Sequence, residues 1–507
     1  MINRRNVIKL AGASVVSCAA GGSVARASTG GVPPAVALRL AQDPRLNHHH
    51  GMAMPTQRPA DAGSHPALAK FSLPLPVLRN ARPISTGGSQ DVFLSSIRPV
   101  TAEVYPGFQA PVYGYFGSWV PPVIRARSGR RTVVIQRNQT KVPVSVHLHG
   151  GVNRDIFDGQ MSRPIAPGGV FTYVYENRQP AAALWLHDHT HHTDAENVYL
   201  GMSSPYIISS AEEEALALPS GEFEVPLVLR DADVGSKGSF IFTMDDPEHR
   251  STILVNGTPW PRMDVKRRKY RFRVINSSAM RFFVLGLSDG TPMTQIGSDA
   301  SLLESPVTAP VVVVSPGERA DLVIDFTKWA SGSTVDVVNY IGPGPMEDIG
   351  QVMRFRIGAD APDTSTVPDR LTTLPAVPNA TVKRTFTLAS SEPGVTPMIG
   401  TINGQAFAMD RIDTTVRFGT TEEWTVTNAN PTVPHNFHCH LAHLRVIDRS
   451  TGAAAPNELG LKDTVQIFPG ESVRVRLTFD AYRGVYPYHC HMLDHGAMGM
   501  MAQLKVV

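Results

Sequence analysis

Cysteine is scarce in this sequence, with three among 507 residues. So few cannot supply a disulfide framework for a chain of this length. Two of them, Cys439 and Cys490, each stand between two histidines, in the segments FHCHL and YHCHM. Because thiolate and imidazole groups bind transition metals, these two cysteines favour a metal site over a disulfide.

The sequence also lacks a large excess of charge of either sign. Its net charge is only +3, and no dense run of Lys and Arg stands out. Nucleic acid and anionic membrane surfaces are therefore not expected as partners. Beyond the N-terminal segment, no stretch approaches the roughly 18 apolar residues that a spanning helix needs, so no membrane span is expected.

The N-terminal segment predicts export. Arg4 and Arg5 precede a run of small and apolar residues, and the sequence ARA ending at Ala27 matches a cleavage site. We expect residues 1–27 to be a twin-arginine signal peptide and the protein to be periplasmic or secreted. Two alternatives are lipid attachment at Cys18, after the lipoprotein-like sequence VVSC, and a short helix that belongs to the fold.

The remaining chain predicts a leader followed by β-sandwiches. Residues 28–70 are rich in Pro, Ala, His and Gly and are expected to form a flexible leader. Short alternating runs such as RTVVIQRN, KYRFRVINSS and ESVRVRLTF follow, separated by turns, with little helix expected. Strand periodicity is interrupted near residues 210–222 and 358–382. We therefore expect an all-β fold with three sandwich domains, 71–215, 216–375 and 376–507.

Ten of the 18 histidines fall in four short clusters. They are His147 and His149 in HLHGG, His187 and His189 in WLHDH, His435, His438 and His440 in PHNFHCH, and His489, His491 and His495 near the C-terminus. Strand side chains two residues apart face the same side, so each H-x-H pair presents two imidazoles toward one point. Two pairs belong to the first domain and two to the last, which predicts metal held between these domains.

Cys490 separates His489 from His491 and should therefore point to the opposite face. One strand would then place a thiolate metal site back to back with the imidazole cluster. A thiolate, two imidazoles and a weak axial methionine form the blue-copper ligand set. The candidates for this set are Cys490, His495, Met500 and, as the second imidazole, His435.

With these motifs in this order, the sequence resembles the three-domain, laccase-type multicopper oxidases, and among them the spore-coat laccase and bilirubin oxidase branch. The resemblance covers nearly all of the mature chain and includes the segments WLHDH, PGERADLVIDF and LKDT. It implies cupredoxin-like Greek-key sandwiches, four copper ions and a monomer that needs no partner chain to complete its sites. The implied reaction couples one-electron oxidation of phenolic or aromatic amine donors to four-electron reduction of O₂ to water.

The resemblance also assigns the ligands to coppers. It implies a type 1 copper at His435, Cys490, His495 and Met500, a type 2 copper at His147 and His438, and a type 3 pair at His149, His187, His189, His440, His489 and His491. Donor electrons would enter at an exposed edge of His495 or His435 and leave through Cys490. Asp158 matches an acidic position that this branch uses beside the trinuclear site; the alternative is a turn aspartate before Gly159.

Some residues depart from this branch or exceed its ligand count. Several bacterial members carry a glutamate at the position of Gly496, as an acid in the proton path, and the nearby Asp494 is not expected to take its place. Cys439 stands where the branch has an apolar residue and is expected to be a buried small side chain. We expect His191 and His192 to be solvated loop residues, although a role beside the copper ligands or in copper entry is an alternative.

Two other functions compete with a laccase. A metallo-oxidase acting on Cu(I) or Mn(II) would require methionine or carboxylate side chains beside the type 1 site. A non-catalytic scaffold of the cell envelope is a remote alternative, because such a protein is expected to lack ligands and none is missing here.

Overall fold

The computed structural model describes residues 63–391 and 399–507. The predicted signal peptide, Cys18 and the leader up to residue 62 lie outside the described residues. Elsewhere strands dominate, and no described helix exceeds six residues, which confirms the expected all-β fold. Within the same ranges, no helix is both long and apolar enough to cross a membrane.

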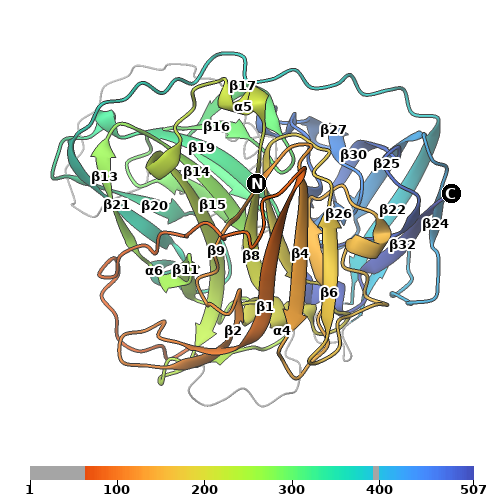
Figure 1. The fold of residues 1–507 in the computed structure, drawn as a ribbon, viewed down its shortest axis with the longest axis horizontal. Coiled ribbons are helices and arrows are strands. Elements are labelled where there is room, and N and C mark those ends of the chain that lie inside the picture. Colours follow the sequence, from red (N-terminus) through yellow and green to blue (C-terminus); the bar gives the residue numbers. More distant parts are fainter. Residues whose placement is uncertain (1–62, 392–398) are drawn as a thin grey trace.

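The first sandwich, strands β1 to β8, has two four-stranded sheets (Figure 1). One sheet has the order β2 (Ala110–Tyr115), β1 (Gln90–Ala102), β4 (Arg131–Asn138) and β6 (Val170–Tyr175). The other has the order β3 (Ile124–Arg127), β8 (Ser203–Ser209), β7 (Ala182–Asp188) and β5 (Val146–His149). Alternate side chains of both sheets, among them Tyr115, Val134 and Leu184, pack into one apolar core.

The middle sandwich, strands β9 to β21, is the largest. Its first sheet has the order β12 (Thr258–Pro259), β11 (Thr252–Val255), β9 (Glu224–Val234), β14 (Lys269–Asn276), β19 (Arg319–Asp325), β16 (Met293–Gly297) and β17 (Leu302–Ala309), with β10 (Phe240–Ile241) beside β9. Its second sheet has the order β13 (Arg262–Arg267), β21 (Gln351–Asp360), β20 (Thr334–Asn339), β15 (Phe283–Leu287) and β18 (Val311–Val314). Phe272, Phe326 and Phe355 lie in the core of this sandwich.

The last sandwich comprises strands β22 to β32. One sheet has the order β23 (Gly400–Ile402), β22 (Val382–Ser390), β25 (Thr421–Asn428), β30 (Ser472–Thr478), β27 (Leu444–Arg449) and β28 (Gly452–Ala453). The other has the order β24 (Thr414–Val416), β32 (Met501–Val506), β31 (Gly484–His489), β26 (His435–Cys439) and β29 (Thr464–Ile467). Its core also takes in Trp185 of β7 and Ile275 of β14, so the last sandwich packs against both of the others.

The three pairs of sheets confirm the three expected sandwiches, whereas the exact domain boundaries stay a prediction. No strand lies between β8 and β9 or between β21 and β22, where the sequence loses its strand periodicity. The second of these connections crosses the molecule from the middle to the last sandwich (Figure 1).

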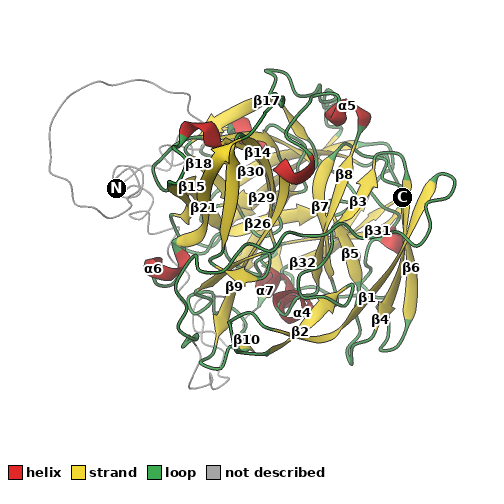
Figure 2. Ribbon diagram, turned by 60° about the vertical axis from the view of Figure 1, so that its left-hand side comes forward, coloured by secondary structure: helices red, strands yellow, loops and turns green. Residues whose placement is uncertain are grey.

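Short helices complete the described fold. The α-helices are α4 (Asp194–Tyr199), α5 (Ala211–Glu214), α6 (Met346–Ile349) and α7 (Leu493–Ala497), and the 3-10 turns are η1 (Asp155–Phe157), η2 (Gly221–Phe223), η3 (Phe326–Lys328) and η4 (Pro456–Glu458). Helix α4 follows the second histidine cluster, α7 contains His495 of the fourth, and the two helices pack against each other (Figure 2).

Candidate metal centres

Strand pairing brings the H-x-H motifs together. In the first sandwich, β5 and β7 pair antiparallel, with His147 opposite His187. In the last sandwich, β26 and β31 pair antiparallel, with His438 opposite His489. The second histidine of each motif follows two residues later, so each sandwich presents four imidazoles at the interface between the two.

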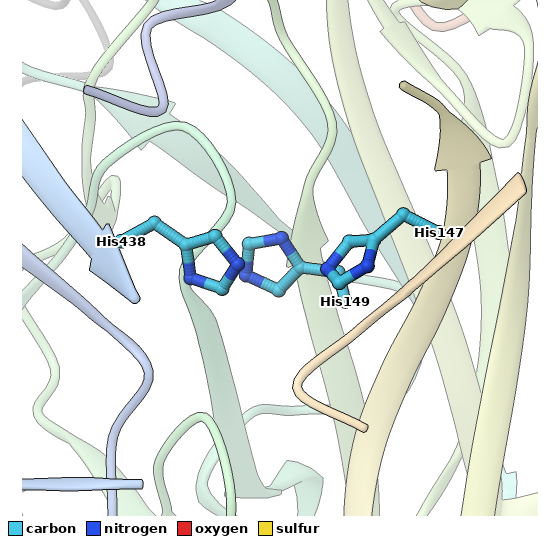
Figure 3. A group of neighbouring side chains, drawn as sticks. All are labelled: His147, His149 and His438. Atoms are coloured by element: carbon cyan, nitrogen blue, oxygen red, sulfur yellow. The ribbon is translucent and has the colours of Figure 1, made fainter. Parts of the chain in front are cut away.

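The eight histidines form one buried cluster, and each is at most 1% exposed. Ligand atoms lie within 4.8 Å of one another in each of these histidine groups: His147, His149 and His438; His149, His187 and His491; and His189, His440 and His489. Figure 3 shows the rings of the first group converging from opposite sides. Because every group takes residues from both sandwiches, the structure brings together all eight predicted cluster ligands between these domains.

Asp158 of the first sandwich and Asp463 of the last each accept hydrogen bonds from cluster histidines of both sandwiches. The Asp158 backbone carbonyl accepts a hydrogen bond from His147 Nδ1 (2.8 Å), and its carboxylate accepts one from His440 Nδ1 of the last sandwich (2.7 Å). The Asp463 carbonyl accepts from His438 Nδ1 (2.8 Å), and its carboxylate accepts from His149 Nε2 of the first sandwich (2.8 Å). Each aspartate therefore fixes one imidazole on its own side and one across the interface.

Burial shifts the acid–base properties of this region. Desolvation, reinforced by neighbouring imidazoles, holds the pKa of His149, His438 and His440 well below the ordinary value for histidine. The neutral rings keep a lone pair for a metal ion. Desolvation also raises the pKa of Asp158 to about 6, against the opposing effect of His147.

The free ring nitrogens show that a metal fits here. Among the described residues, His147 Nε2, His438 Nε2 and His149 Nδ1 are buried without a hydrogen-bond partner. A buried polar atom left unpaired costs about 1–3 kcal/mol, so three beside one another indicate donor atoms arranged for a ligand. Neutral imidazole nitrogens in this arrangement suit copper.

A second centre lies on the other side of the same chain segment. Cys490 Sγ is 3.8 Å from His435 Nδ1 and 3.8 Å from His495 Nδ1, and these two nitrogens are 3.1 Å apart. Met500 is buried, and its carbonyl accepts a hydrogen bond from Cys490 N–H (3.1 Å). The structure thus places Cys490 with His435 and His495, away from the cluster, as the alternation of side chains predicted.

The side chain of Asn436 frames this thiolate site. Its Oδ1 accepts hydrogen bonds from the backbone N–H groups of His491 (2.7 Å) and Met492 (3.0 Å) and from Cys490 Sγ (3.5 Å). Its Nδ2 donates to the carbonyl of Pro316 in the middle sandwich (2.7 Å). One amide therefore fixes the loop that carries Cys490 to a neighbouring domain.

The expected exposed edge of the thiolate site is not observed. His435 and His495 are 0% and 1% exposed, because Asn430 Oδ1 lies 2.8 Å from His435 Nε2 and Asp245 Oδ1 lies 3.5 Å from His495 Nε2. Burial alone would lower the pKa of His495, but Asp245 and Cys490 raise it to about 10. Asp245 comes from the middle sandwich, whose contribution here the sequence did not reveal.

Gly496 and Cys439, the two positions that depart from the family pattern, lie near the centres and in the core respectively. A side chain at Gly496 would begin 3.8 Å from His489 Nδ1, while the Asp494 carboxylate instead accepts from Arg250 Nη2 (2.7 Å) and Asp245 N–H (2.6 Å). Cys439 is buried in the core, as expected.

The two additional histidines differ from each other. His192 is exposed, as expected for a solvated loop residue. His191 is half-buried instead, and its ring packs against those of His192 and Phe407.

Three residues beside the centres were not identified as functional from the sequence: Asp463, Arg319 and Asp245. The first two lie in LKDT and PGERADLVIDF, segments that resembled the family but carried no assigned role. Asp245 lies in a loop without a motif, so only the structure could reveal it.

A thiolate–imidazole site back to back with an interdomain histidine cluster, on three cupredoxin-like sandwiches, defines a copper oxidase. Family models described as multicopper oxidase match residues 96–213 and 368–507. The chain belongs to the multicopper oxidase family, and it is a laccase-like enzyme that uses oxygen as electron acceptor.

Named relatives agree with this assignment. The chain is 36% identical to a bilirubin oxidase of Albifimbria verrucaria over 470 residues, which cover 86% of this chain and 81% of the relative. It is 32% identical to a laccase of Bacillus subtilis over an alignment of 512 positions, which covers 87% of this chain and 99% of that laccase. A multi-copper oxidase structure from Pediococcus acidilactici superposes with a TM-score of 0.81 at 28% identity, covering 92% of this chain and 96% of that one.

Proposed function

We propose that this chain is an exported oxidase of phenolic or aromatic amine donors that reduces O₂ to two waters. A type 1 copper would be held by His435, Cys490, His495 and Met500, a type 2 copper by His147 and His438, and a type 3 pair by His149, His187, His189, His440, His489 and His491. When bound, copper supplies the one-electron redox chemistry that these side chains lack.

The position of Cys490 carries this proposal. Its sulfur faces His435 and His495, while His489 and His491, its neighbours in the chain, belong to the buried cluster. An electron from a donor can therefore reach the cluster through covalent bonds of one short segment. Donor oxidation and oxygen reduction take place at separate sites, which keeps partly reduced oxygen away from the donor.

Asp158 is the proposed source of protons for water formation. Its carboxylate is buried beside the cluster, with Oδ2 on His440 Nδ1. Its Oδ1 has no hydrogen bond within the described part of the chain, and it lies 3.5 Å from His147 Nδ1. A carboxyl group with one oxygen available can hold a proton there, beside the histidines that would hold the type 2 and type 3 coppers.

A metallo-oxidase is a second candidate because of Asp245. This carboxylate is 6% exposed and lies 3.5 Å from His495 Nε2, so it places a negative charge beside the thiolate site at which a donor would be oxidised. Carboxylate oxygens are suitable ligands for Mn(II), and they attract any cationic donor.

Spectroscopy combined with oxygen uptake tests both functions. The copper-loaded protein should bind about four copper ions per chain, show the intense visible absorption of a copper–thiolate bond and consume oxygen on addition of a phenol. Uptake with Cu(I) or Mn(II) but not with phenols would favour the metallo-oxidase. A colourless protein without copper would overturn the proposal.

Export is tested separately. We propose that residues 1–27 direct the protein through the twin-arginine route. Replacement of Arg4 and Arg5 by Lys should retain the protein in the cytoplasm of a host that has this route, as fractionation would show. Unchanged export would contradict the proposed route.

A further inference from the structure

One cluster histidine is oriented differently from most of the others. Five of the eight have Nδ1 against an oxygen atom: His147, His187, His438, His440 and His489. His149 has Nε2 against the Asp463 carboxylate instead, and its Nδ1 has no hydrogen-bond partner among the described residues. The cluster therefore needs His149 in the tautomer that carries hydrogen on Nε2.

Asp463 can select this tautomer because it only accepts hydrogen bonds. Its Oδ1 receives the His149 Nε2–H (2.8 Å) and the Thr464 hydroxyl (2.9 Å). An ionised carboxylate has no proton to offer, so Nε2 must donate and Nδ1 keeps its lone pair. This requires that Asp463 stay ionised and fixed in a site that excludes water.

Arg319 of the middle sandwich meets this requirement. Its Nη1 and Nη2 donate to the two oxygens of Asp463 at 2.7 and 2.5 Å, a bidentate pair between residues at most 2% exposed. The same guanidinium donates to the carbonyls of Ala183 in the first sandwich and of Gly317 and Asp299 in the middle one, each at 2.8 Å. With all these bonds, Arg319 cannot turn away from Asp463.

A close backbone approach supports a direct role for this part of the middle sandwich. Gly317 has a φ of +84°, and a Cβ there would lie 2.7 Å from His491 Nδ1 and 3.0 Å from His149 Cε1. Only glycine can occupy such a position without moving the imidazoles. The turn before β19 therefore packs directly against the cluster histidines, and it leads into Arg319 at the start of the strand.

We propose that Arg319 is a positioning residue of the histidine cluster, which acts through Asp463 to fix the tautomer and orientation of His149. The middle sandwich thereby controls the geometry of a site to which it gives no ligand. This inference rests on the proposed function, since it assumes that His149 binds copper.

Asp463→Asn is the most direct test. The amide has nearly the same shape but replaces one of the two acceptor oxygens by an NH₂ donor, and those oxygens together accept from His149 Nε2 and from Arg319 Nη1 and Nη2. An NH₂ group in place of Oδ1 favours hydrogen on Nδ1 of His149, which removes the lone pair that faces the cluster. An NH₂ group in place of Oδ2 breaks the bidentate pair with Arg319. Arg319→Lys is the second variant, since it keeps the charge but loses the bidentate geometry.

Asp321→Asn is the matched control. Asp321 lies on the same strand, β19, and forms a buried bidentate pair with Arg271 instead of a contact with a histidine. This variant should disturb folding to a similar extent without touching the cluster.

Copper titration and electron paramagnetic resonance provide readouts apart from activity. In Asp463→Asn and Arg319→Lys, cluster affinity for copper should fall roughly 10–100-fold, with an altered paramagnetic signal of the cluster and the thiolate absorption kept. Retained thiolate absorption shows that each variant is folded. Cluster affinities equal to that of Asp321→Asn would overturn the role of Arg319, whereas a wild-type protein without copper would instead overturn the proposed function.

Discussion

The thiolate site and the histidine cluster share the segment from His489 to His491, yet they are assembled differently. The thiolate site takes Cys490, His435 and His495 from the last sandwich alone. The cluster takes four imidazoles from the first sandwich and four from the last, and the middle one supports them through Arg319. The ligands of the first site therefore come from one domain, with Asp245 and Pro316 of the middle sandwich at its edge, whereas the ligands of the second come together only when the first and last domains dock.

The largest effect is expected for substitution of Cys490, which belongs to the thiolate site and not to the histidine cluster. Because serine is a poor copper ligand, Cys490→Ser should abolish the intense visible absorption and reduce donor oxidation to background. The histidine cluster should still bind copper. Absorption spectra and copper content would show this. The control is Cys439→Ala, since that core cysteine lies between the same kind of neighbours; loss of colour there would contradict the assignment.

The second prediction concerns the histidine cluster at the domain interface and substitutes His438. His438→Ala should remove a type 2 ligand and decrease oxygen reduction more than roughly 100-fold, which exceeds the usual effect of losing an outer partner. The visible absorption should remain. Oxygen uptake and the type 2 paramagnetic signal are the measurements, with exposed His192→Ala as control. An unchanged type 2 signal in His438→Ala would exclude the proposed ligand.

A smaller effect is expected for the proposed proton source. Asp158→Asn keeps the size of the side chain but removes its transferable proton, so oxygen reduction should fall roughly 100-fold. Transient kinetics should show that reduction of the thiolate site by the donor is unchanged. Asp155→Asn, nearby on η1, is the control. Equal effects on both half-reactions would indicate a structural role for Asp158.

The smallest expected effect concerns the thiolate site. Asp245→Asn removes a negative charge beside His495, which favours the oxidised copper, so the reduction potential should rise by roughly a few tens of millivolts. A redox titration followed by visible absorption measures this. Asp246→Asn should produce a smaller shift, and a lower potential in Asp245→Asn would contradict the charge argument.

The parts that the sequence predicted are those with a short period or a fixed spacing. Strand alternation was enough to place His147 beside His149 and to direct Cys490 away from His489. The number of sandwiches likewise follows from repeated short strands. These features depend on local backbone geometry, which a few neighbouring residues determine.

The parts that were missed depend on contacts between distant segments. Asp245 reaches His495 from another domain, and this contact buries an edge that was expected to be exposed. Arg319 and Asp463 are 144 residues apart in sequence, and neither belongs to a spaced ligand motif. No local pattern reports such pairs, because docking of the sandwiches creates them.

The division of the cluster between two sandwiches has a consequence for unfolding. An ion held by imidazoles from both domains is a cross-link, and its binding free energy is available only while the domains remain docked. Without copper, the interface keeps buried nitrogens that lack partners among the described residues, and the sandwiches are joined by packing, hydrogen bonds and ion pairs. The copper-free chain should therefore unfold in separate steps and the loaded chain in one cooperative transition. Bound copper would thus decide whether the domains unfold one by one or together.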